Sequence, residues 1–260
     1  MRSTASRSPW PPLTEWTRGD RSSLCSHLQR AEDRDHARRD RARLSIIEYD
    51  IFAGDHLKPQ FKAINPNHKL PAIVDHAPED GEGAMPIFET GAILLYLAEK
   101  SGRLIPSAPR RRMEALQWLA WQISGLGPML GQGYHFARYA PEGQDYGIAR
   151  YTREARRLLG VLNYRLSDQP FLAGEYSIAD IACWPWLQNV GNLDIDRAEF
   201  PAIQRWWDGI AARPAVQRVV RSSTTEVPTA YVQRRMSLTP AQWSNLFGDK
   251  LLDAVASPDP

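Results

Sequence analysis

The spacing of apolar residues changes twice along the 260-residue chain, and these changes limit the fold that it can adopt. Residues 1–43 contain no Ile, Val, Phe or Tyr, so a buried strand is hard to build from them. Residues 44–102 combine short alternating runs with one helical run. From residue 111 onward, apolar residues recur at helical spacing. The pattern predicts a small α/β unit followed by an all-α half.

Three short runs in the α/β unit predict strands, over 44–52, 70–76 and 84–89. The segment "APEDGEG" (77–83) has turn-forming composition, so the last two strands are expected to form a hairpin. A helix is predicted over 90–102, with Thr90 as its cap and Gly102 at its end.

The all-α half is predicted to contain helices over 111–130, 145–168, 177–190, 200–214 and 239–256. The first carries Met113, Leu116, Leu119 and Ile123 at helical spacing and is expected to be kinked near Pro128. Ser177 and Asp180 have the spacing of an N-terminal helix cap, as do Thr239 and Gln242.

These elements divide the chain into five segments. Residues 1–43 are an atypical, Arg-rich segment that we expect to be poorly ordered. The α/β domain is expected over 44–102, a Pro-containing linker over 103–110 and the helical domain over 111–220. Residues 221–260 form an extension with a terminal helix.

Charge and composition exclude several classes of function. Residues 1–43 hold ten Arg and six acidic residues, whereas the rest of the chain carries a formal charge of −2, so no nucleic-acid partner is expected. No apolar run is long enough to span a membrane. With two cysteines and no secretory signal at the N-terminus, a cytoplasmic location is expected. No metal site is expected.

Five phrases, in order, are similar to one known family: "NPNHKLPAIVD", "IFETGAILLYLAEK", "QWLAWQISGLGPMLGQ", "HFARYAPE" and "SIADIACWPW". They resemble the glutathione S-transferase superfamily, and within it the bacterial Nu class, over about Leu44 to Val220. The resemblance implies a thioredoxin-like N-terminal domain that binds glutathione, followed by a helical domain of the same family. It also implies glutathione as the cosubstrate and a homodimer.

The resemblance places the core of the glutathione site at two short stretches. Pro71 is implied to be cis, which would leave the backbone of Leu70 free to pair with the peptide of glutathione. Glu89 would meet the ammonium of the γ-glutamyl group, and Thr90, at a helix N-terminus, its carboxylate. From the residues alone, a trans proline at a strand start is the preferred interpretation of Pro71, and Thr90 is explained by a simple helix cap.

Further residues are candidates for contacts with glutathione. His56 stands where relatives commonly have Gln, although a solvated loop histidine fits the sequence as well. His68 and Lys69, directly before Leu70, are candidates to meet the glycyl carboxylate, and Lys69 is preferred because of its charge. Arg138, which follows Tyr134 and His135 on the kinked helix, would pair with a carboxylate of a second glutathione, or is a solvated arginine.

The sequence departs from the family before Leu44, where the first βα unit is atypical or missing. Relatives carry there a T-P-N-G-like turn that approaches the glutathione sulfur, and no equivalent is found. Cys25 has no apolar strand before it to position it, so we assign no catalytic residue.

The resemblance implies an enzyme in which bound glutathione thiolate reduces a small disulfide or attacks an electrophile. The alternative is a non-catalytic, glutathione-binding or regulatory module of the same fold, which the missing activating turn favours.

Overall fold

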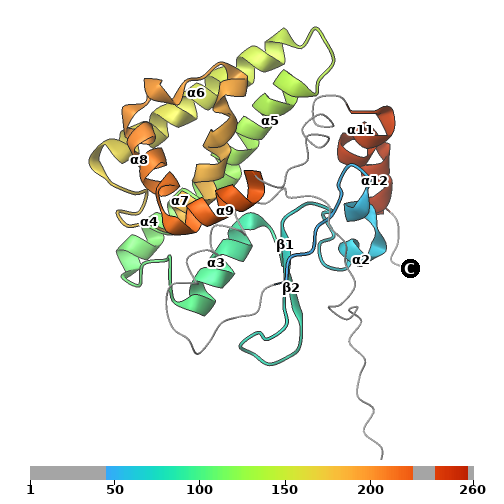
Figure 1. Ribbon diagram of the computed structural model, residues 1–260, viewed down its shortest axis with the longest axis horizontal. Coiled ribbons are helices and arrows are strands. Elements are labelled where there is room, and N and C mark those ends of the chain that lie inside the picture. The colour runs from blue at the N-terminus through green and yellow to red at the C-terminus, as the bar shows by residue number, and fades with distance from the viewer. Residues whose placement is uncertain (1–44, 225–237, 257–260) are drawn as a thin grey trace, which may run out of the picture.

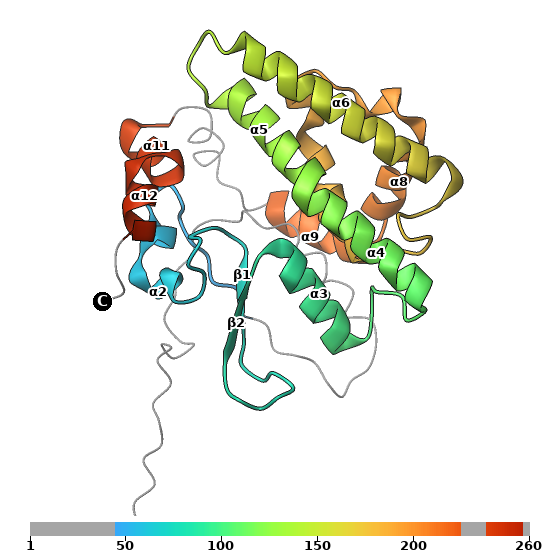
Figure 2. The same cartoon turned by 180° about the vertical axis from the view of Figure 1, so that it is seen from behind.

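A computed structural model describes residues 45–224 and 238–256 of the chain. The α/β unit, described from residue 45 onward, packs beside a larger helical body, and two C-terminal helices lie against the α/β unit (Figure 1). The same arrangement is seen from behind in Figure 2. The predicted segment 1–43 lies outside the described residues.

The α/β unit contains a two-stranded antiparallel sheet. β1 (Ala72–Asp75) pairs with β2 (Met85–Phe88) in the register Ala72 to Phe88 and Asp75 to Met85, which confirms the predicted hairpin. Helix α3 (Thr90–Ser101) follows and ends at Gly102 in the left-handed conformation. Tyr96 of α3 donates a hydrogen bond of 2.5 Å to Asp75, so the helix is fastened to β1.

The predicted strand over 44–52 is wrong for the residues that the structure describes, because residues 45–50 form no strand. A strand needs a neighbour for its backbone hydrogen bonds. The Asp50 carboxylate instead accepts the N–H groups of Phe52 and Ala53 and starts a turn. The turn leads into the short helices η1 (Asp55–Leu57) and α2 (Pro59–Lys62).

The predicted cap of α3 is also wrong in detail. Thr90 is the first helical residue, and Glu89 is the residue before the helix, with φ of 69°. Neither side chain caps the helix by a hydrogen bond. The Thr90 hydroxyl is therefore not engaged at this helix end.

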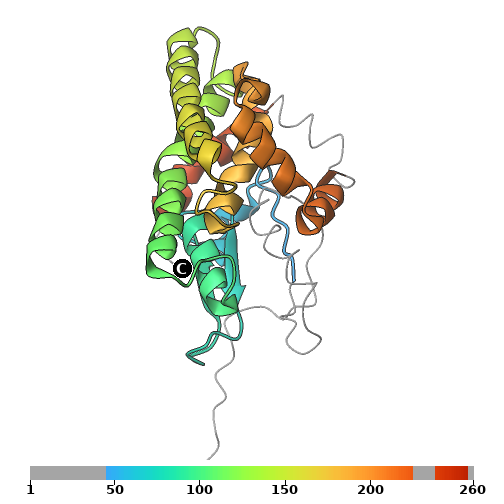
Figure 3. The same ribbon diagram turned by 90° about the vertical axis from the view of Figure 1, so that its left-hand side faces the viewer.

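The helical body is built from long helices around a core of buried Leu residues, among them Leu158, Leu159 and Leu162. Figure 3 shows α4, α5 and α6 running along one side of the molecule. The elements are α4 (Pro109–Trp121), the π-helix η2 (Gln122–Leu126), α5 (Gly127–Arg138), α6 (Asp145–Asp168), α7 (Ile178–Cys183), the 3₁₀-helices η3 (Trp184–Leu193) and η4 (Arg197–Glu199), α8 (Pro201–Ala211) and α9 (Pro214–Thr224).

The first long helix has an irregular turn close to the predicted kink, and two of its apolar residues are exposed. The irregular turn precedes Pro128, because proline lacks the N–H that would bond four residues back, to Ser124 in η2. Met113 and Ile123, two of the apolar residues at helical spacing, are 56% and 39% exposed. In the core of the body, Ala115 and Leu119 take the buried positions of α4.

A buried carboxylate ties three elements of the helical body together. Asp180 accepts hydrogen bonds from the N–H of Leu172 at 3.0 Å, the N–H of Ser177 at 3.0 Å and the indole of Trp206 at 2.8 Å. Together with the Ser177 side chain this forms the predicted capping box. Burial raises the pKa of Asp180 to about 6, so the carboxylate is ionised at pH 7.

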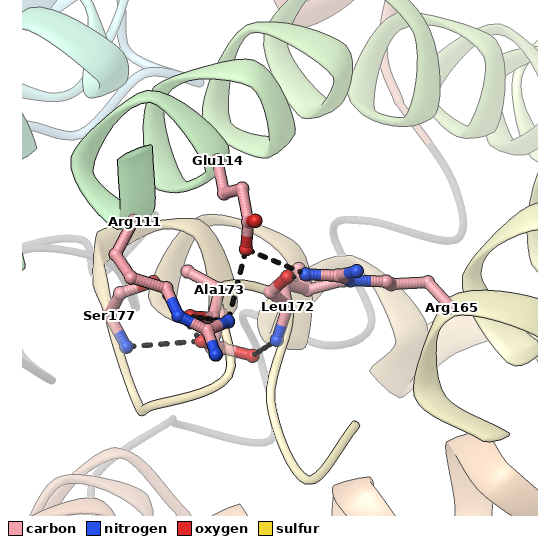
Figure 4. Close-up of polar contacts among 7 residues, drawn as sticks. Arg111, Glu114, Arg165, Leu172, Ala173 and Ser177 are labelled. Carbon is pink, nitrogen blue, oxygen red and sulfur yellow. Dashed lines mark hydrogen bonds and ion pairs between the residues drawn. The ribbon is translucent and has the colours of Figure 1, made fainter. Parts of the chain in front are cut away.

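A second polar group fastens the same loop from outside (Figure 4). Arg165 of α6 donates to the Leu172 carbonyl at 2.8 Å and to Glu114 of α4 at 3.1 Å. Arg111 donates to Glu114 at 3.2 Å and to the Ala173 carbonyl at 3.4 Å. The loop before α7 is thereby held against both long helices.

The C-terminal helix predicted over 239–256 is split into α11 (Pro240–Phe247) and α12 (Asp249–Ala256). The break falls at Gly248, whose extended backbone a helix cannot contain. Thr239 and Gln242 form the predicted capping box. The helical domain is predicted to end at residue 220, whereas helix α9 continues to Thr224.

Helix α11 docks on the α/β unit through Asn245. The Asn245 side chain donates to the Phe52 carbonyl at 2.7 Å, and His56 Nε2 lies 3.2 Å from the Asn245 carbonyl. His56 is 2% exposed, and burial lowers its pKa to about 4. The neutral imidazole therefore belongs to the contact between the two ends of the described chain.

Replacing Asp180 with Asn is expected to lower the free energy of unfolding by about 1–3 kcal/mol, because the amide nitrogen cannot accept the Ser177 N–H. The loss is measured from urea denaturation midpoints at constant slope. Asp208→Asn, an exposed position on α8, is the matched control and should change stability by less than about 0.5 kcal/mol. Equal effects of the two variants would contradict this role for Asp180.

Acid is expected to weaken the protein through His56. The folded pKa of about 4 lies below the ordinary 6.5, so the unfolded chain binds the proton first as the pH falls. The contribution of His56 to the free energy of unfolding is complete above pH 6.5. It falls by up to about 3 kcal/mol as the pH approaches 4. Unfolding measured in urea from pH 7.5 to 4 should show a flatter pH dependence in His56→Gln. The exposed His76→Gln should leave the slope as it is.

Candidate functional site

The two stretches predicted to bind glutathione lie at the same end of the hairpin. Ala72 is paired with Phe88, so the antiparallel register brings Pro71 beside Glu89. The Leu70–Pro71 peptide is cis, as the resemblance implied. In the part of the chain that the structure describes, the backbone of Leu70 has no hydrogen-bond partner. It is available to an extended peptide.

The N-terminus of α3 opens next to this backbone. Thr90 is half-buried and Glu89 is exposed, so both can be reached from outside. The free N–H groups and the dipole at the start of a twelve-residue helix favour a carboxylate. The Glu89 carboxylate offers a partner for an ammonium. Opposite charges of a γ-glutamyl group are thus matched by neighbouring residues.

Close approach of the helical body fixes the position of this helix end. Gly91, the second residue of α3, is buried, and a Cβ at this position would lie 2.1 Å from Cδ1 of Ile123. Ile123 belongs to the π-helix η2. The irregular turn of the helical body therefore packs directly against the end of α3 that carries Thr90.

Two asparagines that the sequence analysis missed support the site. Asn65 is 1% exposed, and its amide donates to the Lys69 carbonyl at 2.6 Å while its oxygen accepts the N–H of Asn67 at 2.9 Å. Asn67 in turn lies 3.5 Å from the Glu89 carboxylate. The Asn-Pro-Asn order at 65–67 is typical of a turn held by its own side chains, and this signal could have identified them.

The structure places His56 apart from Leu70 and Thr90. The buried ring of His56 faces Asn245 of α11. The backbone carbonyl of His56 lies 2.6 Å from Nδ1 of His68, which is also buried. His56 thus supports the loop before Leu70 through buried contacts and offers no exposed group to a ligand.

Lys69 and Arg138 are both exposed, and Lys69 lies towards α11. The Lys69 amine is 3.4 Å from the Leu246 carbonyl. Arg138 is the last residue of α5, and no ion pair is recorded for it among residues 45–224 and 238–256. One turn earlier, the His135 ring packs on Phe247 of α11 at 4.7 Å. Tyr134 instead points into the helical body and donates to the Trp186 carbonyl at 2.6 Å.

Neither cysteine provides an accessible nucleophile in the described part of the chain. Cys183 is buried, and Cys25 lies outside the described residues. The residues given coordinates contain no cluster of His, Cys, Asp or Glu placed to hold a metal ion. None of the helices they form is long and apolar enough to cross a membrane.

Two family models match the chain. The glutathione S-transferase N-terminal domain matches residues 42–99, and the glutathione S-transferase C-terminal domain matches residues 143–214. Both the thioredoxin-like and the helical parts of the predicted fold class are thereby confirmed.

Curated relatives are similar over much of their length. Disulfide-bond oxidoreductase YfcG of Escherichia coli is 52% identical over 171 residues, which cover 65% of this chain and 80% of YfcG. Disulfide-bond oxidoreductase YghU of Escherichia coli is 43% identical over 185 residues, covering 66% of this chain and 63% of YghU.

Solved structures give the same result. A glutathione transferase from Burkholderia graminis, with two glutathione molecules bound per subunit, superposes with a TM-score of 0.69 at 38% identity. The match covers 76% of this chain and 82% of that one. A glutathione transferase from Pseudomonas putida, with one glutathione disulfide per subunit, has a TM-score of 0.65 at 35% identity, covering 79% and 86%. The chain belongs to the glutathione S-transferase family.

Proposed function

We propose that this protein is a glutathione-dependent disulfide oxidoreductase. The observation that carries the proposal is the meeting of the unpaired Leu70 backbone with Glu89 and Thr90 at one end of the hairpin. An extended γ-glutamyl tripeptide would satisfy all three at once. The names of the relatives YfcG and YghU, and the glutathione or glutathione disulfide in solved relatives, support the same chemistry.

Each residue has a defined part in holding glutathione. The Leu70 N–H and C=O, beside Pro71, pair with the cysteinyl backbone, and Glu89 holds the ammonium of the γ-glutamyl group. Thr90 donates its hydroxyl and N–H to the neighbouring carboxylate. Lys69, on the α11 side, and Arg138 add positive charge for the remaining carboxylates of one or two glutathiones. His56 acts indirectly, by supporting the loop that ends at Leu70.

The reaction is two thiol–disulfide exchanges. A glutathione thiolate attacks one sulfur of the substrate disulfide, forming a mixed disulfide and releasing the other sulfur as a thiolate that takes up a proton. A second glutathione thiolate attacks the glutathione sulfur of the mixed disulfide. Glutathione disulfide forms, and the second substrate thiol is released. Electrons come from two glutathiones, so the protein needs no cysteine of its own.

We also propose that the protein is a cytoplasmic homodimer. The apolar side chain of Met113 is 56% exposed on α4. It lines a hollow of about 520 Å³ together with Pro109, Arg110, Glu114 and Gln117. A second copy of the chain would cover this apolar side chain.

Thr90→Val is expected to weaken glutathione binding about 10- to 100-fold, because a charge-assisted hydrogen bond to the carboxylate is lost. Calorimetric titration of the full chain with glutathione measures the change. Thr90→Ser keeps the hydroxyl and should bind nearly as the parent does. The melting temperature should stay within a few degrees, since Thr90 makes no side-chain cap. A Val variant that binds as tightly as the parent would place the carboxylate elsewhere.

Turnover of a small disulfide with glutathione is expected to survive in the double variant Cys25→Ser, Cys183→Ser. Glutathione disulfide formation, coupled to its reductase, measures the rate. Glutathione binding without turnover in the parent would support the alternative of a non-catalytic module. Turnover in the parent that vanishes in the double variant would assign the nucleophile to the protein.

The chain is expected to sediment at twice its mass of 29.4 kDa. Met113→Asp should shift the equilibrium towards the monomer, because it buries a charge at the proposed contact. Tyr164→Asp, at a position on α6 that is 79% exposed, is the control and should leave the mass unchanged. A monomeric parent protein would refute the dimer without bearing on glutathione binding.

A further inference from the structure

Helix α6 carries a single row of exposed residues along its outer surface. The helix lies on the side of the helical body away from β1 and β2 (Figure 1). Between its first and last turns, the exposed positions follow one another at spacings of four, three, four, three and four residues. We call this row the arginine ridge, and its members are Tyr146, Arg150, Arg153, Arg157, Gly160 and Tyr164.

The spacing makes the ridge nearly straight. Its average of about 3.5 residues is close to one helical turn, so successive members stand one above the other. From Tyr146 to Tyr164 the ridge is about 27 Å long, at 1.5 Å per residue. A Cβ built on Gly160 would meet no heavy atom within 4 Å, so the ridge is open there. A second helix can lie along such a row because its own side chains repeat at the same spacing.

Positive charge on the ridge exceeds the negative charge beside it. Arg150, Arg153 and Arg157 are three and four residues apart, so they repel one another. The half-buried Glu154 lies 2.7 Å from Arg157 and 3.8 Å from Arg150. No ion pair is recorded for Arg153 among residues 45–224 and 238–256. Three arginines and one glutamate therefore leave positive charge for carboxylates from outside.

A tyrosine stands at each end of the ridge. Tyr146 is 84% exposed and Tyr164 is 79% exposed, more than the other exposed large apolar side chains of the described residues. Tyrosine and arginine are the residue types that often carry most of the binding energy in protein interfaces. The ridge thus combines two aromatic contacts with a charged centre.

An acidic helix fits the ridge better than a nucleic acid or a lipid surface does. Single-stranded nucleic acids stack successive bases on aromatic rings in a basic groove. The two rings of the ridge are about 27 Å apart, with no ring between them. A lipid surface takes up the apolar face of a helix, and the apolar face of α6 is already buried through Leu158, Leu159 and Leu162.

We propose that the arginine ridge docks a helix of another protein that carries Glu or Asp at the same three-and-four spacing. Its carboxylates pair with Arg150 and Arg153, and apolar residues at the ends of its acidic row contact Tyr146 and Tyr164. This inference does not rest on the proposed function, because α6 contributes no residue to the proposed glutathione site.

The test uses two labelled helical peptides of the same composition. The first has Glu at three-and-four spacing, with Leu at both ends of the row. The second has its glutamates spread around the helix. Fluorescence anisotropy with the full chain should show at least tenfold tighter binding of the first peptide, which weakens as salt is raised. Equal binding of the two peptides, or no binding, would overturn the proposal.

Two charge reversals test the location. Arg153→Glu should weaken binding of the first peptide at least tenfold, and Arg153→Lys should keep most of it. Lys250→Glu, at an exposed position on α12, makes the same change in charge and should leave binding within about twofold. Equal effects of Arg153→Glu and Lys250→Glu would refute the ridge as the binding surface. Because Arg153 is exposed, an unchanged melting temperature is expected to show that its variants fold.

Other occupants are tested under the same conditions with oligothymidylate and with vesicles of phosphatidylserine and phosphatidylcholine. Tighter binding of either one than of the first peptide, lost in Arg153→Glu, would overturn the assignment to an acidic helix. Arg153→Glu should leave glutathione binding and disulfide turnover unchanged. A chain that binds the first peptide but not glutathione would refute the proposed function and leave the ridge in place.

Discussion

The helical body depends on the buried carboxylate of Asp180. A carboxylate taken out of water is tolerated only when its oxygens are hydrogen-bonded, and three donors from the loop, α7 and α8 supply these bonds. The loop before α7 is held in the same place by Arg165 and Arg111 from the long helices. The helical body meets α3 through α7, through Ile123 of η2 beside Gly91, and through the ion pair of Arg112 with Glu99.

The end of the hairpin that we propose to hold glutathione is small, and the helical body helps to fix its geometry. A two-stranded hairpin is marginal alone, but α3 fastens to it through Tyr96 and Asp75. Ile123 of the π-helix packs where a side chain on Gly91 would stand. The helix end that carries Thr90 is therefore positioned by contacts from both domains.

Local patterns predicted much of this fold. Helix α6 has the predicted bounds, and the Ser177 and Asp180 cap lies where its spacing placed it, because these features depend on near neighbours in sequence. The strand predicted over 44–52 failed because pairing depends on a distant partner that alternation does not reveal. The structural role of His56 could not be predicted from local patterns either, since Asn245, which buries it, is 189 residues away. Lys69, Leu70, Glu89 and Thr90 came from a family resemblance, and the resemblance could not show that α11 would lie beside them.

The contact between Asn245 and Phe52 spans 193 residues, and this distance has a consequence for the order of assembly. Loop closure over so long a segment is entropically costly until the intervening domains are compact. During synthesis the α/β unit and the helical body leave the ribosome before α11 does. The contact of α11 with the α/β unit is consequently the last of these contacts to form.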